Sequence, residues 1–573
     1  MTLRIAIAQI DPIVGGFESN LAKIKESYER ACAGQARFLL TPELSICGYP
    51  PHDLVERPEM FERNEKALED LALITRGKKC ALGVGHIQRN PQPTGRAAQN
   101  AFSFIENGKR VFTQTKTLLP TYDVFDESRY FEPAQSIHVW DCDGIKIGVA
   151  ICEDLWARDP ALERNIYRSD PVDSYQALNV QVLLSASASP FILGKGARRE
   201  KIHSEIAKLL KCPLVYVNQV GATDEILFDG GSFAVDHKGK QIGRLPFFEP
   251  SFAVIDIESS GGCQWISPQI HSKSQEEDLE LEKLYQGLVL GIRCYFQRTG
   301  FSKAVLGLSG GIDSAVVGTL ACHALGPKNV LGVAMPSQFS SSHSLEDAYQ
   351  LAKNLGMHFE VKPIKFMNSV ALREISEGRG TLASLAQENL QARLRGLILM
   401  TLSNHENALV LTTGNKSELA TGYCTLYGDM VGALAPLGDL YKTKVYELAR
   451  FINHKYGHEL GALIPESSIT KAPSAELRPN QTDQESLPPY DLLDQILEQY
   501  IEKRLPADQI QSQFGSLLEN TQYMTRYGKN WVKDILRKVE LNEYKRRQSA
   551  PVLKVSNKAF GIGRRVPLAR SWD

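Results

Sequence analysis

The segment KAVLGLSGGIDSAVVGTLACHALG, residues 303–326, decides how the second half of the chain is expected to fold. Its apolar strand pattern ends at Leu308, two glycines follow, and a helical pattern begins near Asp313. Glycine lets the backbone approach an anion closely, and a helix N-terminus presents free N–H groups with partial positive charge. We therefore predict a loop that binds pyrophosphate. The alternative is a plain glycine turn whose Asp or Ser caps the helix.

Further strand patterns follow this loop along the chain. NVLGVAMP (329–336), HFEVKPI (358–364) and ALVLTTG (408–414) are apolar runs between helical stretches. This succession favours a Rossmann-like, doubly wound parallel sheet that binds ligands at the carboxyl ends of its strands. The sequence contains neither GxxxxGK(S/T) nor GxGxxG, so it lacks the Walker A and dinucleotide-binding fingerprints. Asp313 repels phosphate unless a divalent cation lies between them, which predicts Mg2+ at the loop.

The first half of the chain alternates short β-rich runs with helical stretches. Its strand patterns include RIAIAQI (4–10), IKIGVAICE (145–153) and VQVLLSASAS (180–189). Strands interleaved with helices and hairpins predict a layered α/β domain with mixed sheets.

Two segments lack hydrophobic periodicity, and we use them to predict a domain boundary and a long loop. Residues 258–279 gain Gly, Ser and charge, so we predict a linker between a domain over 1–257 and a domain over 280–573. Residues 467–490 are rich in Pro and Ser and are too long for an ordinary connection. A loop of this kind predicts a mobile lid or a disordered piece.

Composition narrows the class of protein. At 573 residues the chain is too long for one core, and 43% hydrophobic and 23% charged residues are ordinary for globular proteins. A net charge of -1 gives no basic field for nucleic acid, and no apolar run reaches the length of a membrane span. The first residues lack a signal-peptide pattern, and the ten cysteines are scattered without a CxxC pair. We expect a reduced, cytoplasmic protein that does not bind membranes.

The SGGxDS pattern of the phosphate loop resembles the signature of the ATP pyrophosphatases. Longer stretches indicate which group within that family the chain resembles. ENLQARLRG (388–396), TTGNKSELATGYCTLYGDMVGALAPLGDLYKTKV (412–445) and PSAELRPNQTDQESLPPYD (473–491) are similar to NAD synthetases. The resemblance implies an adenine nucleotide alpha hydrolase-like domain. Such a domain adenylates nicotinic acid adenine dinucleotide with ATP, and ammonia then displaces AMP.

The same resemblance assigns residues to this second site. It implies that Asp313 and Glu418 hold Mg2+ and that Lys442 places positive charge on the polyphosphate. Without the resemblance, such charged residues are ordinary solvated surface. The expected ATP-binding residues are Ser309, Gly310, Gly311, Asp313, Ser314, Thr413 and Lys442, and the expected deamido-NAD-binding residues are Asn389, Arg393, Glu418 and Lys545.

Cys152 stands in VAICEDLW (149–156), where a cysteine follows an apolar run. A free cysteine is most often a small buried apolar group. Glu43 in FLLTPELSICGYPP and Lys116 in KTLLPTYDVFDESRYF change that interpretation, because the three stretches together resemble the Glu-Lys-Cys triad of the nitrilase superfamily. The resemblance implies an α-β-β-α sandwich and a cysteine nucleophile, with Glu127 as a second acid that orients Lys116. Taken singly, Glu43 is equally a helix cap and Lys116 a surface charge.

The charges of the triad indicate how the thiol would react. If Glu43 and Lys116 are equally near Cys152, their effects on a thiolate largely cancel. We therefore expect Cys152 to pass its proton to Glu43 rather than to form a standing ion pair. The resemblance places the glutamine contacts at Tyr122, Glu153, Ser187 and Arg198, with Ser185, Ser189 and Arg199 left open as alternatives.

Taken over nearly the whole chain, the sequence resembles the glutamine-dependent NAD+ synthetases. The resemblance implies glutamine, ATP and nicotinic acid adenine dinucleotide as substrates, transfer of ammonia between two sites, and a homo-oligomer of at least two chains. Two alternatives remain: a stand-alone nitrilase-type amidase with a nucleotide-sensing second domain, and a catalytically silent scaffold. The basic run at 545–547 resembles a nucleic-acid patch by composition, although closure over an acidic substrate or a subunit contact fits the family better.

Overall fold

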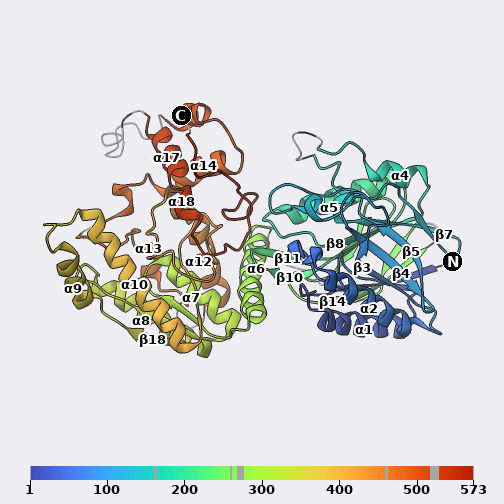
Figure 1. Ribbon diagram of the computed structural model, residues 1–573, viewed down its shortest axis with the longest axis horizontal. Helices are drawn as coiled ribbons and strands as arrows, with labels where there is room; N and C mark the ends of the chain where they lie inside the picture. The colour runs from blue at the N-terminus through green and yellow to red at the C-terminus, as the bar shows by residue number, and fades with distance from the viewer. Residues whose placement is uncertain are drawn as a thin grey trace. The chain divides into compact units, whose positions relative to one another are not determined.

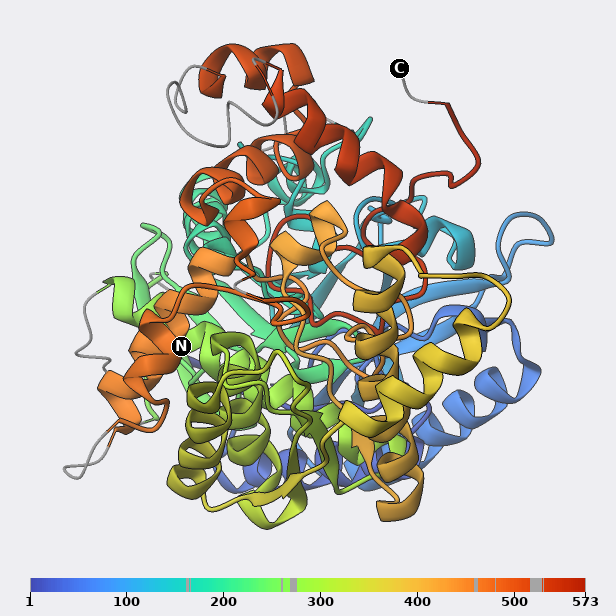
Figure 2. The same cartoon turned by 90° about the vertical axis from the view of Figure 1, so that its left-hand side faces the viewer.

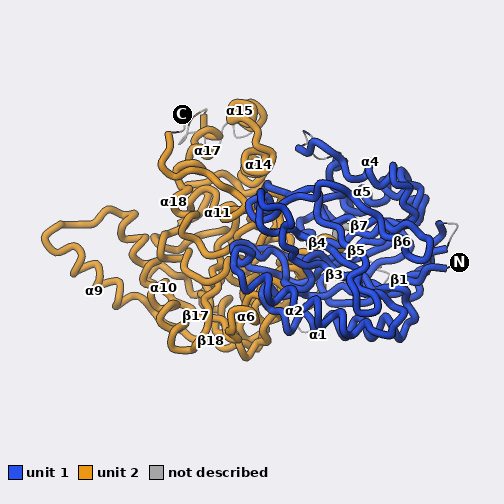
Figure 3. Tube along the Cα trace, turned by 45° about the vertical axis from the view of Figure 1, so that its right-hand side comes forward, with its two compact units in different colours: residues 1–274 blue, residues 275–573 orange. Residues whose placement is uncertain are grey.

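The computed structural model divides the chain into two compact units, residues 1–274 and 275–573, coloured blue and orange in Figure 3. Each unit has its own core and is described by itself. Among the described residues, no helix combines the length and apolar character needed to cross a membrane. The structure describes residues 2–160, 164, 166–258, 261–267, 276–457, 462–479, 481–515, 528 and 530–571.

Unit 1 is built on two stacked sheets. One has seven strands in the order β15-β14-β1-β2-β3-β4-β5, and the other has six in the order β13-β12-β9-β8-β7-β6. Alternate residues of each strand face the space between the sheets, as the two-residue period of a strand requires. Ile5 and Ile7 of β1 and Val149 and Ile151 of β7 belong to this shared core.

Helices cover the outer face of each sheet of unit 1. The side chains of α1 and α2 pack on the residues of the seven-stranded sheet that face outward, such as Ala6 and Leu39. The side chains of α4 and α5 cover Ala150 and Leu183 of the six-stranded sheet. In Figure 1 these two helix pairs lie on opposite sides of the strands. The predicted α-β-β-α sandwich is confirmed.

The elements of unit 1 alternate along the chain as the sequence predicts, with additional short strands. The strands are β1 (Thr2–Gln9), β2 (Phe38–Leu40), β3 (Ala81–Arg89), β4 (Ala98–Glu106), β5 (Lys109–Thr115), β6 (Val139–Cys142), β7 (Ile145–Ile151), β8 (Val182–Ser187), β9 (Leu214–Asn218), β10 (Val220–Thr223), β11 (Ile226–Asp229), β12 (Phe233–Val235), β13 (Gln241–Arg244), β14 (Ser251–Glu258) and β15 (Cys263–Trp265). The helices are α1 (Phe17–Ala33), η1 (His52–Glu56), α2 (Pro58–Thr75), α3 (Glu127–Tyr130), η2 (Cys152–Leu155), α4 (Pro171–Ala177) and α5 (Lys195–Leu210).

Unit 2 contains a four-stranded, fully parallel sheet in the order β18-β17-β16-β19. The chain runs outward from β16 to β17 and β18 and then returns to place β19 on the other side of β16. This reversal is a topological switch point, and ligands bind beside the carboxyl ends of the strands at such points. The glycine loop follows β16 and Thr412 follows β19, so both lie there. The predicted doubly wound parallel sheet is confirmed.

A helical region follows the sheet of unit 2. Leu493 and Leu497 of α14 pack with Ile535 of α17 in a separate core cluster, which includes residues of α11. Helices α14 and α17 are drawn in orange-red and red in the upper part of Figure 2. The strands of unit 2 are β16 (Ala304–Gly307), β17 (Val330–Ala334), β18 (His358–Val361) and β19 (Leu409–Val410). The helices are α6 (Glu276–Thr299), α7 (Ile312–Leu325), η3 (Pro327–Asn329), α8 (Ser342–Leu355), α9 (Lys365–Ser376), α10 (Ser384–Glu406), α11 (Lys416–Thr421), α12 (Lys442–Tyr456), α13 (Glu466–Thr470), η4 (Asp483–Glu485), α14 (Tyr490–Ile501), α15 (Ala507–Phe514), α17 (Trp531–Leu541) and α18 (Glu543–Arg546).

The range predicted as a linker, 258–279, contains ordered structure of both units. β15 adds an edge strand to the seven-stranded sheet, and α6 begins at Glu276. Gly261, with φ of 82°, closes the turn that joins β14 to β15. Its N–H donates to the Glu258 carbonyl at 2.9 Å. A three-residue strand next to glycines has no detectable period, which explains why the sequence did not predict it.

Candidate active sites

Strand ends bring the three predicted catalytic residues of unit 1 together. Glu43 follows β2, Lys116 follows β5, and Cys152 is the first residue after β7. Cys152 has φ of 43°, in the left-handed region that a residue with a side chain occupies only at a cost. Such strain is found at functional sites, where the surrounding structure enforces it.

Lys116 lies between two buried carboxylates. Its Nζ donates to Glu43 Oε1 and to Glu127 Oε1, each at 2.7 Å, and all three side chains are nearly inaccessible to water. Glu43 also accepts from Asn100 Nδ2 at 2.7 Å and from the backbone N–H of Ala188 at 2.9 Å. These bonds fix Glu43 at both oxygens, and the expected role of Glu127 beside Lys116 agrees with this geometry.

The electrostatics of this cluster favour a neutral thiol. Burial raises the pKa of the Cys152 thiol; Glu43 raises it further, and Lys116 opposes the rise. Burial raises the pKa of Glu127 to about 7, against the effect of Lys116. Burial would lower the pKa of Lys116, but Glu127 and Glu43 raise it well above its usual value. The cluster therefore holds a fixed ammonium group beside a thiol that stays protonated at neutral pH.

A second pair of opposite charges lies beside Cys152. Glu153 is buried and accepts from the hydroxyls of Tyr122 at 2.9 Å and Tyr167 at 2.6 Å. Lys195, the first residue of α5, is near enough for its charge to lower the pKa of Cys152. Its own pKa is lowered to about 8 by burial, and its Nζ lies 5.1 Å from the centre of the Trp156 ring. Glu153 and Lys195 thus act on the thiol in opposite directions, Glu153 raising the pKa of Cys152 and Lys195 lowering it.

The glycine loop of unit 2 has the backbone that an anion site needs. Gly310 has φ of 78°, and a Cβ placed there would lie 2.2 Å from the Ser344 carbonyl oxygen. The Ser309 hydroxyl lies 3.2 Å from the Ser314 hydroxyl and accepts from the Gly311 N–H at 3.2 Å. No side chain in the described part of the chain caps the N-terminus of α7. The first amides of α7 are therefore open to an anionic ligand.

Two carboxylates converge on one ammonium group next to this loop. Lys442 Nζ makes a short contact with Asp313 Oδ2 and lies 3.4 Å from Glu418 Oε1. Asn415 Nδ2 donates to Asp313 Oδ1 at 3.0 Å and holds that carboxylate in place. Burial raises the pKa of Glu418 to about 8, with Asp313 adding to the rise and Lys442 opposing it.

This donor set suits Mg2+ in the presence of phosphate. Asp313 and Glu418 supply hard oxygen atoms, and they already share one cation, the Lys442 ammonium. Within the described ranges, no group of three or more His, Cys, Asp or Glu side chains is arranged to hold a metal. Two carboxylates alone match an ion that keeps several waters and takes its other ligands from substrate phosphates.

Known families match both halves of the chain. The carbon-nitrogen hydrolase family matches residues 4–266, and the NAD synthase family matches residues 284–549. A glutamine-dependent NAD(+) synthetase of Synechocystis sp. is 43% identical over 572 residues, which cover 99% of each chain. Another, from Thermotoga maritima, is 37% identical and is matched over 99% of its length. The chain belongs to the glutamine-dependent NAD(+) synthetase family.

A solved structure supports the same conclusion. The glutamine-dependent NAD+ synthetase of Acinetobacter baumannii, determined in complex with ADP, is 35% identical with a TM-score of 0.76. The match covers 100% of this chain and 99% of that chain. A stand-alone amidase is not favoured, because full-length synthetases match the chain from end to end.

The predicted glutamine contacts of this family member divide into two groups. Tyr122 and Glu153 lie beside Cys152, and Ser187 ends β8 with its hydroxyl 3.3 Å from that of Ser185. Arg198 pairs instead with Asp159 at 3.1 Å, and its side chain is 38% exposed.

The alternative arginine takes a different position. Arg199 is buried, pairs with Asp229 at 3.1 Å and donates to the Ser189 hydroxyl at 3.3 Å. Its charge and that of Lys195 both act on the Cys152 site. The charges of Lys195 and Arg199 thus interact with Cys152, whereas Arg198, which the sequence predicts as a glutamine contact, pairs with Asp159.

Three of the residues predicted to bind the dinucleotide, Asn389, Arg393 and Lys545, contact the segment 422–426. Thr413 is half-buried after β19. Asn389 accepts from the Thr425 hydroxyl at 2.9 Å, and Arg393 Nε donates to the Leu426 carbonyl at 3.2 Å. Lys545 Nζ donates to the carbonyls of Gly422 and Cys424, at 2.7 and 2.8 Å.

The described part of the 467–490 segment contacts the phosphate loop. The Ser468 hydroxyl donates to the Gly310 carbonyl at 3.0 Å. Lys471 pairs with Glu476 at 2.8 Å, and the Ser344 hydroxyl donates to the same carboxylate at 2.7 Å. Residue 480 lies outside the described residues. The Ser468 bond ties the segment to Gly310, which is expected to bind ATP, and the other two bonds hold Glu476 in place.

Sequence reasoning missed several residues of both sites. Asn100 donates to Glu43, and Tyr49 donates to Glu127 at 2.7 Å. Tyr167 donates to Glu153, and the charge of Lys195 acts on Cys152. Asn415 caps α11, and an Asn directly before a helix is a capping signal that the sequence already contains.

Proposed function

We propose that this chain makes NAD+ from nicotinic acid adenine dinucleotide, with ATP as the activating substrate and glutamine as the nitrogen source. The observation that carries this proposal is the presence of two chemically complete sites on one chain. Unit 1 has a buried nucleophile with a base and an ammonium group. Unit 2 has an anion loop with two carboxylates and a lysine. A glutaminase would not need the unit 2 site, and a synthetase supplied with free ammonia would not need the unit 1 site.

The reaction in unit 1 begins with a proton transfer. Cys152 Sγ attacks the side-chain carbonyl carbon of glutamine while its proton passes to Glu43. Lys116 faces the oxyanion that forms, and electrostatic stabilisation of this kind is usually the largest single contribution. Glu43 returns the proton to the departing nitrogen, so ammonia and a thioester result. Glu43 then takes a proton from water, whose oxygen attacks the thioester to give glutamate and free Cys152.

Recognition of the amino-acid end of glutamine uses the charge pair beside Cys152. Free glutamine carries an ammonium and a carboxylate group, and a site that recognises both needs one anion and one cation. Glu153 supplies the anion, oriented by Tyr122 and Tyr167. Lys195 supplies the cation. We propose Lys195 for this role in place of Arg198, whose charge is already paired with Asp159.

The reaction in unit 2 joins a carboxylate to AMP. The Ser309–Ser314 loop and the N-terminus of α7 receive the ATP phosphates. Asp313 and Glu418 would hold Mg2+, which neutralises phosphate charge when bound. Lys442 adds positive charge at the same place, and the nicotinate carboxylate oxygen attacks the α-phosphorus as pyrophosphate leaves. Ammonia then attacks the acyl carbon, and AMP departs with its oxygen to leave the amide of NAD+.

The working form of the protein is proposed to be a homo-oligomer in the cytoplasm. Helices α9 and α10 lie side by side in unit 2 and expose large apolar side chains, including Phe366 at 81% and Leu385 at 67%. Exposed apolar surface of this kind marks an interaction site, and we assign it to a second copy of the chain. All ten cysteines are free thiols, which favours a reducing compartment.

Ammonia is proposed to pass between the sites inside the protein, so an external ammonia trap should not stop glutamine-driven synthesis.

Cys152→Ala tests the proposed division of labour. We expect the variant to lose NAD+ formation from glutamine by at least about 10⁴-fold, because a missing nucleophile cannot be replaced by its neighbours. NAD+ formation from ammonium salts should stay within about twofold, since Asp313, Glu418 and Lys442 all lie in unit 2. Both rates are measured by the NAD+ produced.

A variant of unit 2 provides the reciprocal control. Lys442→Met should reduce synthesis from both nitrogen sources while glutamine hydrolysis continues. Equal loss of both nitrogen sources in Cys152→Ala would refute the assignment of separate chemistry to the two units.

A further inference from the structure

Helix α11 carries Glu418, and its last carbonyl groups all have partners. This helix has six residues, Lys416–Thr421, too few for stability on its own. The Glu418 carbonyl accepts from the N–H groups of Gly422 and Tyr423. The Leu419 and Ala420 carbonyls accept from Arg546 at 2.9 and 2.8 Å, and Asn542 donates to Thr421 at 3.1 Å. Residues 542–546 therefore satisfy the groups that a helix C-terminus leaves open.

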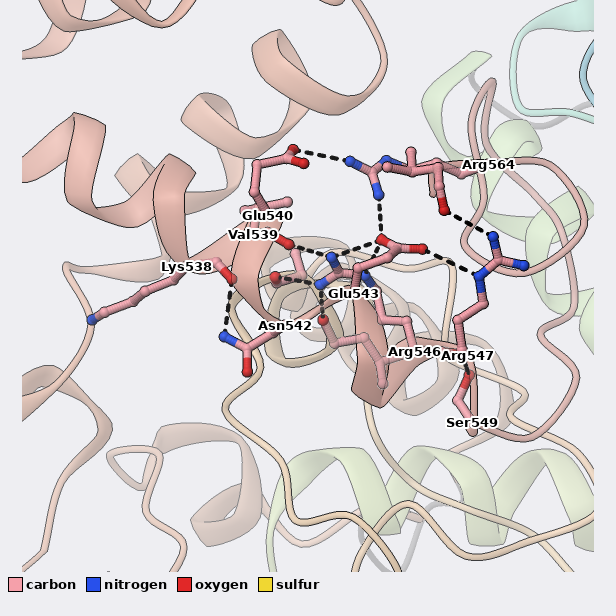
Figure 4. Close-up of polar contacts among 12 residues, drawn as sticks. Lys538, Val539, Glu540, Asn542, Glu543, Arg546, Arg547, Ser549 and Arg564 are labelled. Atoms are coloured by element: carbon pink, nitrogen blue, oxygen red, sulfur yellow. Dashed lines mark hydrogen bonds and ion pairs between the residues drawn. The ribbon is translucent and has the colours of Figure 1, made fainter. Parts of the chain in front are cut away.

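Arg546 makes contacts in three directions, which Figure 4 shows in part. Its Nη1 donates to α11, its Nη2 to the Val539 carbonyl of α17, and its Nε and Nη2 to Glu543 at 3.1 and 2.9 Å. The side chain is 1% exposed, and its Cζ lies 4.8 Å from the centre of the Phe560 ring. All five guanidinium N–H groups have an acceptor, so the residue links α11 rigidly to α17 and α18.

The other end of α11 is held by the site itself. Asn415 caps the helix by accepting from the Glu418 N–H at 3.0 Å, and the same side chain donates to Asp313 at 3.0 Å. Glu418 in turn accepts from the Asn415 N–H at 3.3 Å. The helix is therefore fixed between Asp313 at its start and Arg546 at its end, and the position of Glu418 depends on both.

We propose that Arg546 is a positioning residue for the Mg2+–ATP site, acting through α11 on Glu418. The inference deepens the proposed function and rests on it, since it concerns the same site. The guanidinium supplies both a cation at the negative end of a helix and a planar set of donors that reaches two carbonyls at once. Partners that orient metal-ligating carboxylates commonly change metal affinity or activity by about 10- to 100-fold when removed.

This role separates Arg546 from its neighbour in the basic run. Arg547 has a side chain that is 47% exposed, lies 3.9 Å from Glu543 and donates to the Val566 carbonyl at 2.8 Å. Among the described residues, neither the hydrogen bond nor the ion pair of Arg547 involves α11. A nucleic-acid patch needs accessible cations, and Arg546 is buried, so the structure assigns the two arginines different tasks.

Two variants of Arg546 test the proposal, with Arg547→Met as the matched control. Arg546→Met should raise the Mg2+ concentration that gives half-maximal ammonia-driven NAD+ formation by about tenfold or more. It should also speed amide hydrogen exchange over residues 415–424 of the full chain. Arg546→Lys should lie between Arg546→Met and the wild type, because an ammonium group cannot reach both sets of carbonyls. Arg547→Met should match the wild type in both measurements, and glutamine hydrolysis should stay unchanged throughout.

Each outcome decides the proposal. Wild-type Mg2+ dependence together with wild-type exchange at α11 in Arg546→Met would overturn it. Lower thermal stability with unchanged Mg2+ dependence would also overturn it, because Arg546 would then be only structural. If Arg546→Met does not fold, Arg546→Lys and Asn542→Ala decide in the same way. If the wild type makes no NAD+, the proposed function fails separately, and Mn2+ binding in the presence of ATP, measured with the same variants, still tests Arg546.

Discussion

Replacing Lys195 with arginine should move the alkaline side of the pH profile for glutamine hydrolysis. Burial lowers the pKa of Lys195 to about 8, and Arg199 adds to this effect. The ammonium form binds the glutamine carboxylate under our proposal. The Lys195 ammonium group is therefore present below about pH 8 and is lost as the pH rises through that value, so glutamine binding should weaken at alkaline pH.

The size of the effect follows from that pKa. At pH 7 roughly nine molecules in ten carry the charge, and at pH 9 roughly one in ten does, so kcat/KM should fall about tenfold between them. Arginine stays charged over this whole range, so Lys195→Arg should lose this decline. Lys195→Met removes a charged hydrogen bond worth about 1.5–3 kcal/mol, which is about a 10- to 100-fold loss of kcat/KM at pH 7. Most of that loss should appear in KM.

The assay is ammonia release from glutamine between pH 6.5 and 10, without ATP. The ammonium group of glutamine also titrates in this range, but it does so equally for every variant. The difference between wild type and Lys195→Arg therefore reports Lys195 alone. Lys201→Arg is the control, because Lys201 is an exposed residue of the same helix. An identical alkaline decline in the wild type and in Lys195→Arg would refute the assignment of Lys195 to the substrate carboxylate.

Two further predictions concern unit 2. Gly310→Ala places a Cβ 2.2 Å from the Ser344 carbonyl at a backbone φ of 78°, so pyrophosphate release should fall by about 100-fold or more while glutamine hydrolysis continues. Pyrophosphate release at the wild-type rate would contradict the position of the phosphates. Phe366→Glu puts a charge on the apolar surface of α9, and sedimentation velocity should detect smaller species than in the wild type. An unchanged sedimentation coefficient would mean that this surface is not the contact between copies.

The fold could be predicted from local patterns because each layer has its own period. Leu3, Ile5 and Ile7 alternate along β1 and mark the face that packs against the second sheet. The glycine loop before α7 was equally clear, because its glycines follow an apolar strand directly. Both signals depend on residues that are adjacent in sequence. The short strands, such as β15, carry no such signal and depend on pairing with a distant partner.

The sequence could predict those residues of the candidate sites that belong to recognisable motifs. Glu43, Lys116 and Cys152 follow three separate strands, and the stretches that resemble the nitrilase triad contain all three residues. The choice among the cations of α5 could not be made from the sequence, because a sequence gives no direction for a side chain. Lys195 and Arg199 are one helical turn apart and share a face of α5, whereas Arg198 points to Asp159.

The basic run near the C-terminus shows the same difference between composition and position. Three consecutive cations suggested a surface that attracts an acidic partner. In the structure, Lys545 and Arg546 donate to backbone carbonyls of unit 2, and only Arg547 is substantially exposed. A buried arginine is tolerated only when each of its donors has an acceptor, and the end of a short helix is one of the few places that supplies several carbonyls together. The carbonyls of α11 therefore explain why a positive charge is buried at position 546. We expect a change at this position to act on Glu418, which the same helix carries.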